Sequence, residues 1–340
     1  MPRHRWDPVA PYVRVVHPLH VGVDLTPDQA RGRRFVRTAR GLYVPSDTDR
    51  LLAQQRVVEV AARMPASAAI TGWAACLLHG AAWFDGLAAD GRTRLPVGVA
   101  VGPRGGVRRG ADVAISFEQL PEWEVWHRYG VRVARPERAV FDEMRRHDER
   151  EALVVLESAL AGRITSLERF SAYARRHRSA RRYAVVAWAL PRARGGVRSP
   201  AEVRVRTVAE EDAGWPRLFV NPVVLTGEGR RIGEVDLVDT TAAAAIEVDG
   251  ADHRDGEQQA WDITKEEALR RTGLEVTRAT GRQALDRATL APRLVDVRAR
   301  ALAAARDQSW RLAPHSFDLE AWLTEREATA LVHEHLRDTG

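Results

Sequence analysis

Cysteine, lysine and long apolar runs are almost missing from this sequence of 340 residues. The one cysteine, Cys76, excludes an internal disulfide framework and a cysteine-based zinc site, and its apolar surroundings indicate a core residue. No stretch of about 18 apolar residues occurs, and residues 1–7 carry no apolar signal region. The sequence therefore predicts a cytoplasmic protein without a membrane segment. A hydrophobic fraction of 45% excludes a wholly disordered chain.

Arginine supplies nearly all of the positive charge, because Lys265 is the only lysine among the 52 basic side chains. The net charge of +6 is unevenly placed. Residues 1–198 carry 33 basic and 20 acidic side chains, whereas residues 199–340 carry 19 and 26. Arginine and alanine richness can also reflect a GC-rich genome. The asymmetry indicates a basic module that faces a polyanion, joined to an acidic module.

A segment rich in proline, glycine and arginine over residues 191–198 indicates a linker. The pattern ahead of it is typical of an α+β region, and the pattern over residues 199–308 is typical of an α/β domain. Residues 309–340 are expected to form a helical appendage, with a helix over 317–336. In the first half, helices are expected over 51–64, 70–79, from 136, over 149–161 and 166–176, and strands over 95–101 and 131–134.

A helix start is encoded by Ser199, Pro200 and Glu202, which supply an N-cap, a first-turn proline and a capping-box acid. Glu202 also lies at the end of the apolar stripe formed by Val205 and Ala209. Two interpretations remain open: Glu202 is only a cap, or it is an acid that points inward to a site.

Two short apolar strands follow, over residues 232–238 and 242–248, and each contains an acid. If the hairpin turn centres on residues 240–241, Asp236 lies across from Ala245, and Glu247 and Asp249 share its face. Three clustered carboxylates favour a hard divalent cation, Mg²⁺ or Mn²⁺. The alternative is a turn at Asp249 and a salt bridge from Asp236 to an arginine.

Beyond the hairpin, His253 precedes a helix expected from residue 262 to residue 272, and a strand is expected over 274–278. Lys265 lies in the first turn of that helix. His253 is either a solvated side chain or a base or phosphate ligand beside the metal.

These elements resemble the endonuclease-like domain related to very-short-patch repair endonucleases, within the PD-(D/E)XK nuclease superfamily. The motifs SPAE, GEVD, IEVDGADH and DITKEEALRRTGLEVTRAT carry the resemblance over residues 199–306. It implies an αβββαβ restriction-endonuclease-like core and Mg²⁺-dependent hydrolysis of phosphodiester bonds. Glu202 would be the helix acid, and Asp236 and Glu247 the metal ligands.

One position departs from the superfamily pattern. Asp249 stands where the superfamily usually has its catalytic lysine. An aspartate cannot stabilise negative charge that develops on a phosphate. His253 and Lys265 are therefore expected to take the proton-transfer and charge-stabilising roles.

The N-terminal half resembles AbiEi-type antitoxin proteins, which carry a winged helix followed by an α+β domain. A capping box at Thr26 and Gln29 leads into RGRRFVRTARGLYVP, which resembles the wing, and TGWAACLLHG and YGVRVARPERAVFDEM resemble the next domain. Residues 1–65 are expected to be winged-helix-like and residues 66–190 to form the α+β domain. No complete helix-turn-helix is recognisable ahead of the wing, so no recognition helix is assigned.

Two sets of arginines are expected to contact DNA phosphates, the alternative being a solvated surface. They are Arg31, Arg33, Arg34, Arg37, Arg40, Arg175, Arg176, Arg178, Arg181 and Arg182. The expected function is a Mg²⁺-dependent DNA endonuclease. The alternative is a non-catalytic DNA-binding regulator with an inactive nuclease fold. A toxin or defence-system partner is implied only by the resemblance.

Overall fold

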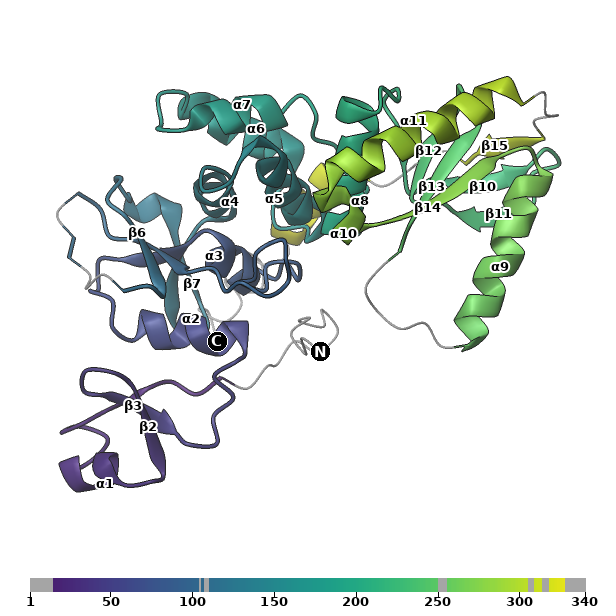
Figure 1. Cartoon of the computed structure of the whole chain (residues 1–340). Coiled ribbons are helices and arrows are strands. Elements are labelled where there is room, and N and C mark those ends of the chain that lie inside the picture. The colour runs from purple at the N-terminus through teal and green to yellow at the C-terminus, as the bar shows by residue number, and fades with distance from the viewer. Residues whose placement is uncertain are drawn as a thin grey trace. The chain divides into compact units, whose positions relative to one another are not determined.

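The computed structural model describes residues 15–103, 105–106, 110–249, 256–304, 309–313 and 318–327, with only the backbone placed for residues 256–262. The chain forms two compact units, Met1–Pro191 and Arg192–Gly340. Each unit combines helices with β-sheets (Figure 1), which confirms the mixed α/β class. No helix within these described ranges is long and apolar enough to cross a membrane.

A small antiparallel sheet begins the described part of the first unit. Its strands are β1 (Leu19–His20), β2 (Phe35–Ala39) and β3 (Leu42–Pro45), in the order β1-β3-β2. Helix α1 (Pro27–Arg31) precedes β2, and the capping box of Thr26 and Gln29 is confirmed. Helix α1, β2 and the turns beside them therefore carry the first of the two arginine sets, Arg31, Arg33, Arg34, Arg37 and Arg40.

A five-stranded sheet forms the centre of this unit, in the order β6-β5-β4-β8-β7. Its strands are β4 (Ala69–Thr71), β5 (Val97–Ala100), β6 (Val113–Ser116), β7 (Val125–Arg128) and β8 (Val131–Ala134). The helices are α2 (Ala53–Ala61), α3 (Trp73–Leu78), α4 (Pro136–Met144), α5 (Glu149–Ala161), α6 (Leu167–Arg176) and α7 (Tyr183–Ala189). Both expected strands and the helices expected outside 70–79 are confirmed.

The helix expected over residues 70–79 is wrong in its first part. Residues Ala69–Thr71 form the central strand, and α3 begins at Trp73. Between them Gly72 has a φ of 64°, and a Cβ there would lie 2.5 Å from Glu143 Oε2. The apolar run hides this break because buried strands and buried helices have similar composition.

The second unit starts with α8 (Pro200–Thr207), which continues into a π-helical turn at Val208–Asp212. Its strands are β9 (Phe219–Val220), β10 (Val223–Thr226), β11 (Arg231–Glu234), β12 (Leu237–Asp239), β13 (Ala244–Asp249), β14 (Glu275–Thr280) and β15 (Trp310–Leu312). The remaining helices are α9 (Gly256–Arg271), α10 (Gly281–Leu285) and α11 (Arg287–Ala303). Two sheets result, β14-β13-β12-β9 and β11-β10-β15.

The larger sheet of the second unit has a different core on each face. Leu237 and Ile246 pack with side chains of α8 and α11, whereas Val238 and Ala245 pack with Leu269 of α9. Because side chains alternate along a strand, Glu247 and Asp249 share the face of Ala245. The acids of β13 therefore face the α9 side of the sheet.

The register of the central hairpin differs from the expected one. Leu237 pairs with Ile246 and Val238 with Ala245, which brings Asp236 opposite Glu247 rather than Ala245. The connecting loop is longer than a two-residue turn, because Asp239 pairs with Ala244. Within the loop, the Asp239 carboxylate accepts hydrogen bonds from the backbone N–H groups at residues 241 and 242. The structure thus places the two acids closer together than the sequence indicates.

The end of the chain also departs from the expected boundary at residue 309. Strand β15 pairs antiparallel with β10, so residues 310–312 belong to the sheet and not to an appendage. Three residues are too short a run to show a strand pattern in the sequence. Residues 319–327 are helical, and the rest of the helix expected to residue 336 lies outside the described residues.

Candidate functional site

The centre of the candidate site is a pair of carboxylates on neighbouring strands. Asp236 lies in the break between β11 and β12, and Glu247 lies opposite it on β13. Asp236 Oδ2 accepts a hydrogen bond from the Val248 backbone N–H at 2.6 Å. This bond fixes the orientation of the Asp236 carboxyl group against the strand that carries Glu247.

The electrostatics of this pair are unfavourable. Burial, followed by the neighbouring Glu247 carboxylate, raises the pKa of Asp236 from 3.8 to about 7. Glu202 adds to the increase, while Lys265 and the Val248 N–H act in the opposite direction. Two carboxylates in this setting require a shared proton or a cation.

Glu202 lies in the first turn of α8, where the sequence left open a cap alone or an acid that points inward. Its backbone N–H donates to Ser199 Oγ at 3.3 Å, as an N-cap requires. Its side chain is only 5% exposed, and Oε2 accepts from the Arg198 N–H at 2.9 Å and from Asn221 Nδ2 at 2.6 Å. Glu202 is therefore a buried acid held by neutral donors, and its carboxylate accepts from the Arg198 N–H and Ser199 Oγ instead of forming the expected capping box with the Ser199 N–H.

Asn221 connects Glu202 to the carboxylate pair, and sequence reasoning missed it. It has a φ of 48° and interrupts the strand path between β9 and β10. Its backbone N–H donates to the Asp236 carbonyl oxygen at 2.8 Å. The dipeptide formed with Pro222 is a turn signal that could have indicated this kink.

Lys265 reaches the site from α9. Its Nζ lies 2.7 Å from Glu247 Oε1, and both side chains are nearly buried, at 12% and 15% exposure. A Cβ at Gly233 on β11 would lie 3.2 Å from Lys265 Cδ, so the glycine leaves room for the lysine stem. The structure thus brings the only lysine of the chain to the acids.

Asp249 pairs with an arginine rather than with the Asp236–Glu247 pair. Asp249 ends β13 and forms an ion pair with Arg278 Nη1 at 3.2 Å. Arg278 also pairs with Glu266 at 2.9 Å. Asp249 is the last residue of β13, and the rest of the turn expected after it, like His253, lies outside the described residues.

The donor set was tested against a divalent ion. Carboxylate oxygens suit Mg²⁺ and Mn²⁺, and Glu247 Oε1 is buried without a hydrogen-bond partner, since the Lys265 contact is an ion pair that lacks hydrogen-bond geometry. Burial, followed by the charge of Glu247, raises the pKa of Asp236, and a bound cation would oppose both effects. No group of three or more acidic, histidine or cysteine side chains is arranged for a metal within the described residues. The two strand acids fit the ion as an incomplete ligand set.

Comparisons with known proteins assign no family to this chain. No family model, curated protein or solved structure matches it. The chemistry of the site therefore rests on its own geometry.

All ten arginines expected to contact DNA are exposed, but they form two separate sets. The first set lies on α1, β2 and their flanking turns, and the second lies at the end of α6 and before α7. Figure 1 shows α1 and α6 at opposite ends of the first unit. Arg31 pairs with Asp28 at 2.6 Å, and Arg182 donates to the His147 carbonyl at 2.6 Å. These two guanidinium groups are partly engaged within the protein.

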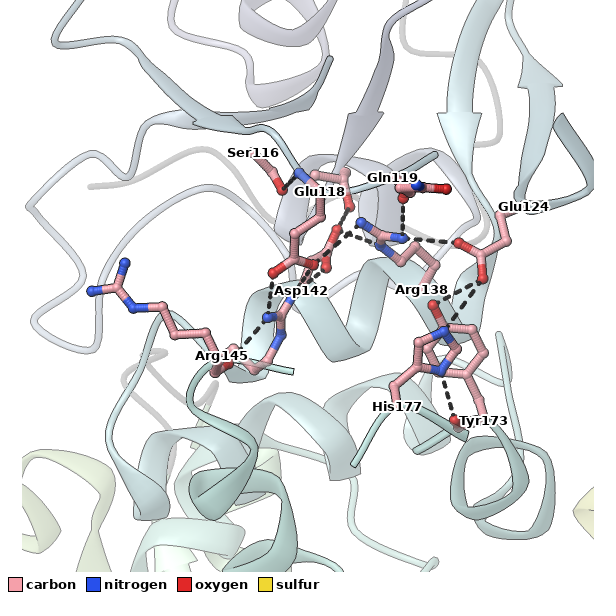
Figure 2. Close-up of polar contacts among 11 residues, drawn as sticks. Ser116, Glu118, Gln119, Glu124, Arg138, Asp142, Arg145, Tyr173 and His177 are labelled. Atoms are coloured by element: carbon pink, nitrogen blue, oxygen red, sulfur yellow. Dashed lines mark hydrogen bonds and ion pairs between the residues drawn. The ribbon is translucent and has the colours of Figure 1, made fainter. Parts of the chain in front are cut away.

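A buried polar network in the first unit was missed from the sequence. Figure 2 shows Arg138 of α4 between Asp142 and Glu124, each bonded at 2.9 Å. Asp142 also accepts from Thr71 on β4 at 2.7 Å and from Arg145 at 2.9 Å. Burial alone would raise the pKa of Asp142, but the two arginines hold it below 3.8. The spacing of four and three residues along α4 is the signal that could have placed these charges on one helix face.

The same network extends to α6, although Arg138 Nη2 and Arg145 Nε within it are buried without a hydrogen-bond partner. The Tyr173 hydroxyl donates to Glu124 at 3.1 Å, and burial raises the pKa of Tyr173 (Figure 2). His177 Nδ1 donates to the Tyr173 carbonyl oxygen at 2.9 Å, and the two side-chain rings stack. The Arg138–Glu124 ion pair and the Tyr173–Glu124 hydrogen bond join η1 (Glu122–Glu124) to α4 and α6.

Proposed function

We propose that this chain is a divalent-metal-dependent endonuclease that hydrolyses DNA phosphodiester bonds. The observation that carries the proposal is the buried pair of Asp236 and Glu247: Glu247 Oε1 lacks a hydrogen bond and has only the Lys265 ion pair, and the pKa of Asp236 is raised to about 7. The order α8, strands, α9, β14 supports a PD-(D/E)XK core. The β1–β3 sheet with α1 supports a winged-helix-like region.

Asp236 and Glu247 would hold Mg²⁺ or Mn²⁺, and Glu202 would orient them through Asn221. The ion, when bound, polarises the phosphate and lowers the pKa of a bound water. Lys265 supplies a fixed positive charge beside Glu247, from a helix rather than from the strand position of Asp249. Its ammonium group stabilises negative charge at the phosphate, a role that the superfamily usually gives to the strand lysine.

Asp249 has a different role in this proposal. Its pairing with Arg278 anchors the end of β13 to β14 and to Glu266 of α9. His253 stays a predicted proton-transfer residue. The strand position usually held by lysine thus carries a carboxylate that positions the neighbouring helix.

The basic N-terminal unit would supply affinity for DNA. Exposed guanidinium groups contact phosphates without reading sequence, so binding weakens as salt rises. Binding to a labelled duplex should therefore fall steeply between about 50 and 200 mM salt. Affinity that stays constant over this range would contradict phosphate contact by the arginine sets.

Cleavage of end-labelled single-stranded, double-stranded and mismatched DNA tests the nuclease. The full chain should cut at least one substrate in Mg²⁺ or Mn²⁺ and none in EDTA. Asp236→Asn should abolish cutting, while the control Asp296→Asn, on the exposed surface of α11, should cut like wild type. Cleavage by Asp236→Asn at the wild-type rate would refute the metal site.

A non-catalytic DNA-binding regulator is the second candidate. Two observations favour it: Asp249 replaces the usual lysine, and no three-ligand group exists in the described part of the chain. In that case DNA binding persists, while neither Mg²⁺ nor Mn²⁺ supports cleavage or raises the melting temperature. A toxin or defence-system partner stays a prediction from the resemblance.

A further inference from the structure

A cavity of about 530 Å³ lies in the first unit, between β2, α2 and the start of β5. Its lining combines four arginines, two acids and an apolar wall. The lining residues that carry charge are Arg50, Arg56, Arg63, Arg94, Glu59 and Asp112. A cavity of this size suits a small ligand, since such sites span roughly 300 to 1,000 Å³.

Two of the four arginines are neutralised inside the cavity wall. Arg50 forms a two-pronged contact with Glu59, with Nε at 3.0 Å from Oε1 and Nη2 at 2.9 Å from Oε2. Arg63 pairs with Asp112. Both acids of the lining are thereby used, and no carboxylate of the lining pairs with the other two arginines.

Arg56 is held by neutral carbonyl groups, and no ion pair joins it to a carboxylate among the described residues. Nη1 donates to the Gly86 carbonyl at 3.2 Å and Nη2 to the Leu95 carbonyl at 2.5 Å, and the guanidinium lies 5.2 Å from the Trp73 ring centroid. Burial, followed by the like charge of Arg94, lowers the pKa of Arg56, while the charges of Asp85 and Asp112 act in the opposite direction. Because neutral carbonyls fill only part of its five-donor fork, donors remain for an anion.

Arg94 provides the second cation. It is exposed on the loop before β5, and no carboxylate ion pair to it exists among the described residues. Arg56 and Arg94 thus bring two guanidinium groups to one cavity, and each guanidinium fork can match phosphate oxygens. The apolar wall beside them is lined by Leu51, Val60, Leu95, Val97 and Ala111.

We propose that this cavity binds a nucleotide, with Arg56 and Arg94 on its phosphate and the apolar wall against its sugar and base. The phosphate belongs to a free mononucleotide or to one nucleotide of a single strand. The site uses residues of the first unit alone, so it does not depend on the proposed nuclease.

Calorimetric titration of the full chain in EDTA tests the site. The probes are deoxyadenosine monophosphate, deoxyadenosine without phosphate, and a ten-residue oligothymidylate. Arg94→Gln should weaken binding of a phosphate-bearing probe about tenfold, the usual size of one lost charged hydrogen bond. Arg92→Gln, on the same loop but outside the cavity lining, should bind like wild type.

A second variant keeps the test independent of folding. Arg56→Lys retains a positive charge but loses the guanidinium fork, so it should also weaken binding. Arg94→Gln should have the same melting temperature as Arg92→Gln, which shows that the variant is folded. Binding of the mononucleotide assigns a free nucleotide, and binding of the oligonucleotide alone assigns a strand. The proposal is overturned if deoxyadenosine binds as well as its monophosphate, if Arg94→Gln leaves binding unchanged, or if no probe binds.

Discussion

Replacement of Asp236 by asparagine should stabilise the metal-free protein while removing its proposed activity. The aspartate is disfavoured as an anion because it is buried opposite Glu247, and asparagine has the same shape without the charge. Its side-chain oxygen can still accept the Val248 N–H. The change therefore removes a repulsion and keeps the hydrogen bond.

The size of the effect follows from the pKa. Deprotonation of a carboxyl whose pKa rises from 3.8 to about 7 on folding opposes folding by at most about 4 kcal/mol at high pH. Asp236 is half-buried and the Lys265 charge is close by, so solvent and this charge reduce the effect and we expect about 1–2 kcal/mol. For a unit of this size that corresponds to a melting temperature raised by roughly 2–8 °C.

The direction of the Asp236 pKa shift determines how the stability gain depends on pH. The folded-state pKa of Asp236 is raised, so the destabilisation is absent below about pH 4, grows as the pH rises to about 7, and is then constant. Calorimetric unfolding in EDTA at pH 5 and pH 8 measures it, with Asp296→Asn as the control. A variant that is no more stable than wild type at pH 8, or a gain equal at both pH values, would refute the reasoning. Added Mg²⁺ should stabilise wild type more than Asp236→Asn.

Three further changes test other contacts. Lys265→Gln should lower the rate of DNA cleavage with little effect on DNA affinity, measured by single-turnover kinetics, and an unchanged rate would exclude its role. Arg298→Ala should destabilise the second unit by about 2 kcal/mol in urea unfolding, because it leaves the fully buried Asp239 carboxylate without its guanidinium partner. Burial lowers the pKa of His147, but the hydrogen bond to Glu143 and the charges of Glu143, Glu151 and Asp148 together raise it above its usual value. Its stabilisation is present below pH 6.5 and lost as the pH rises through the folded value, so His147→Gln should lack this loss in melting curves from pH 6 to 9.

Local signals predicted the parts of the fold that depend on neighbouring residues. The capping box at Thr26, the N-cap at Ser199 and the strand over residues 131–134 all depend on short spacings. The helix over 70–79 failed because one glycine with positive φ separates a strand from a helix. Hydrophobic composition could not distinguish the two once both were buried.

The site divides in the same way. The sequence identified Asp236 and Glu247 as acids on adjacent strands, but the register that sets them opposite each other depends on the Asp239 turn. The contact of Lys265 with Glu247 depends on how α9 lies on the sheet. Neither distance is encoded in residue spacing.

The sequence by itself determined the unequal charge of the two halves, the mixed α/β class, the helix caps and the carboxylates of the second unit. Tertiary structure alone decided that Asn221 joins Glu202 to Asp236, and that Arg56 and Arg94 line one cavity. The physical reason is range. Caps and strand alternation arise between residues a few positions apart, whereas ion pairs, strand register and cavities arise between segments that only packing brings together.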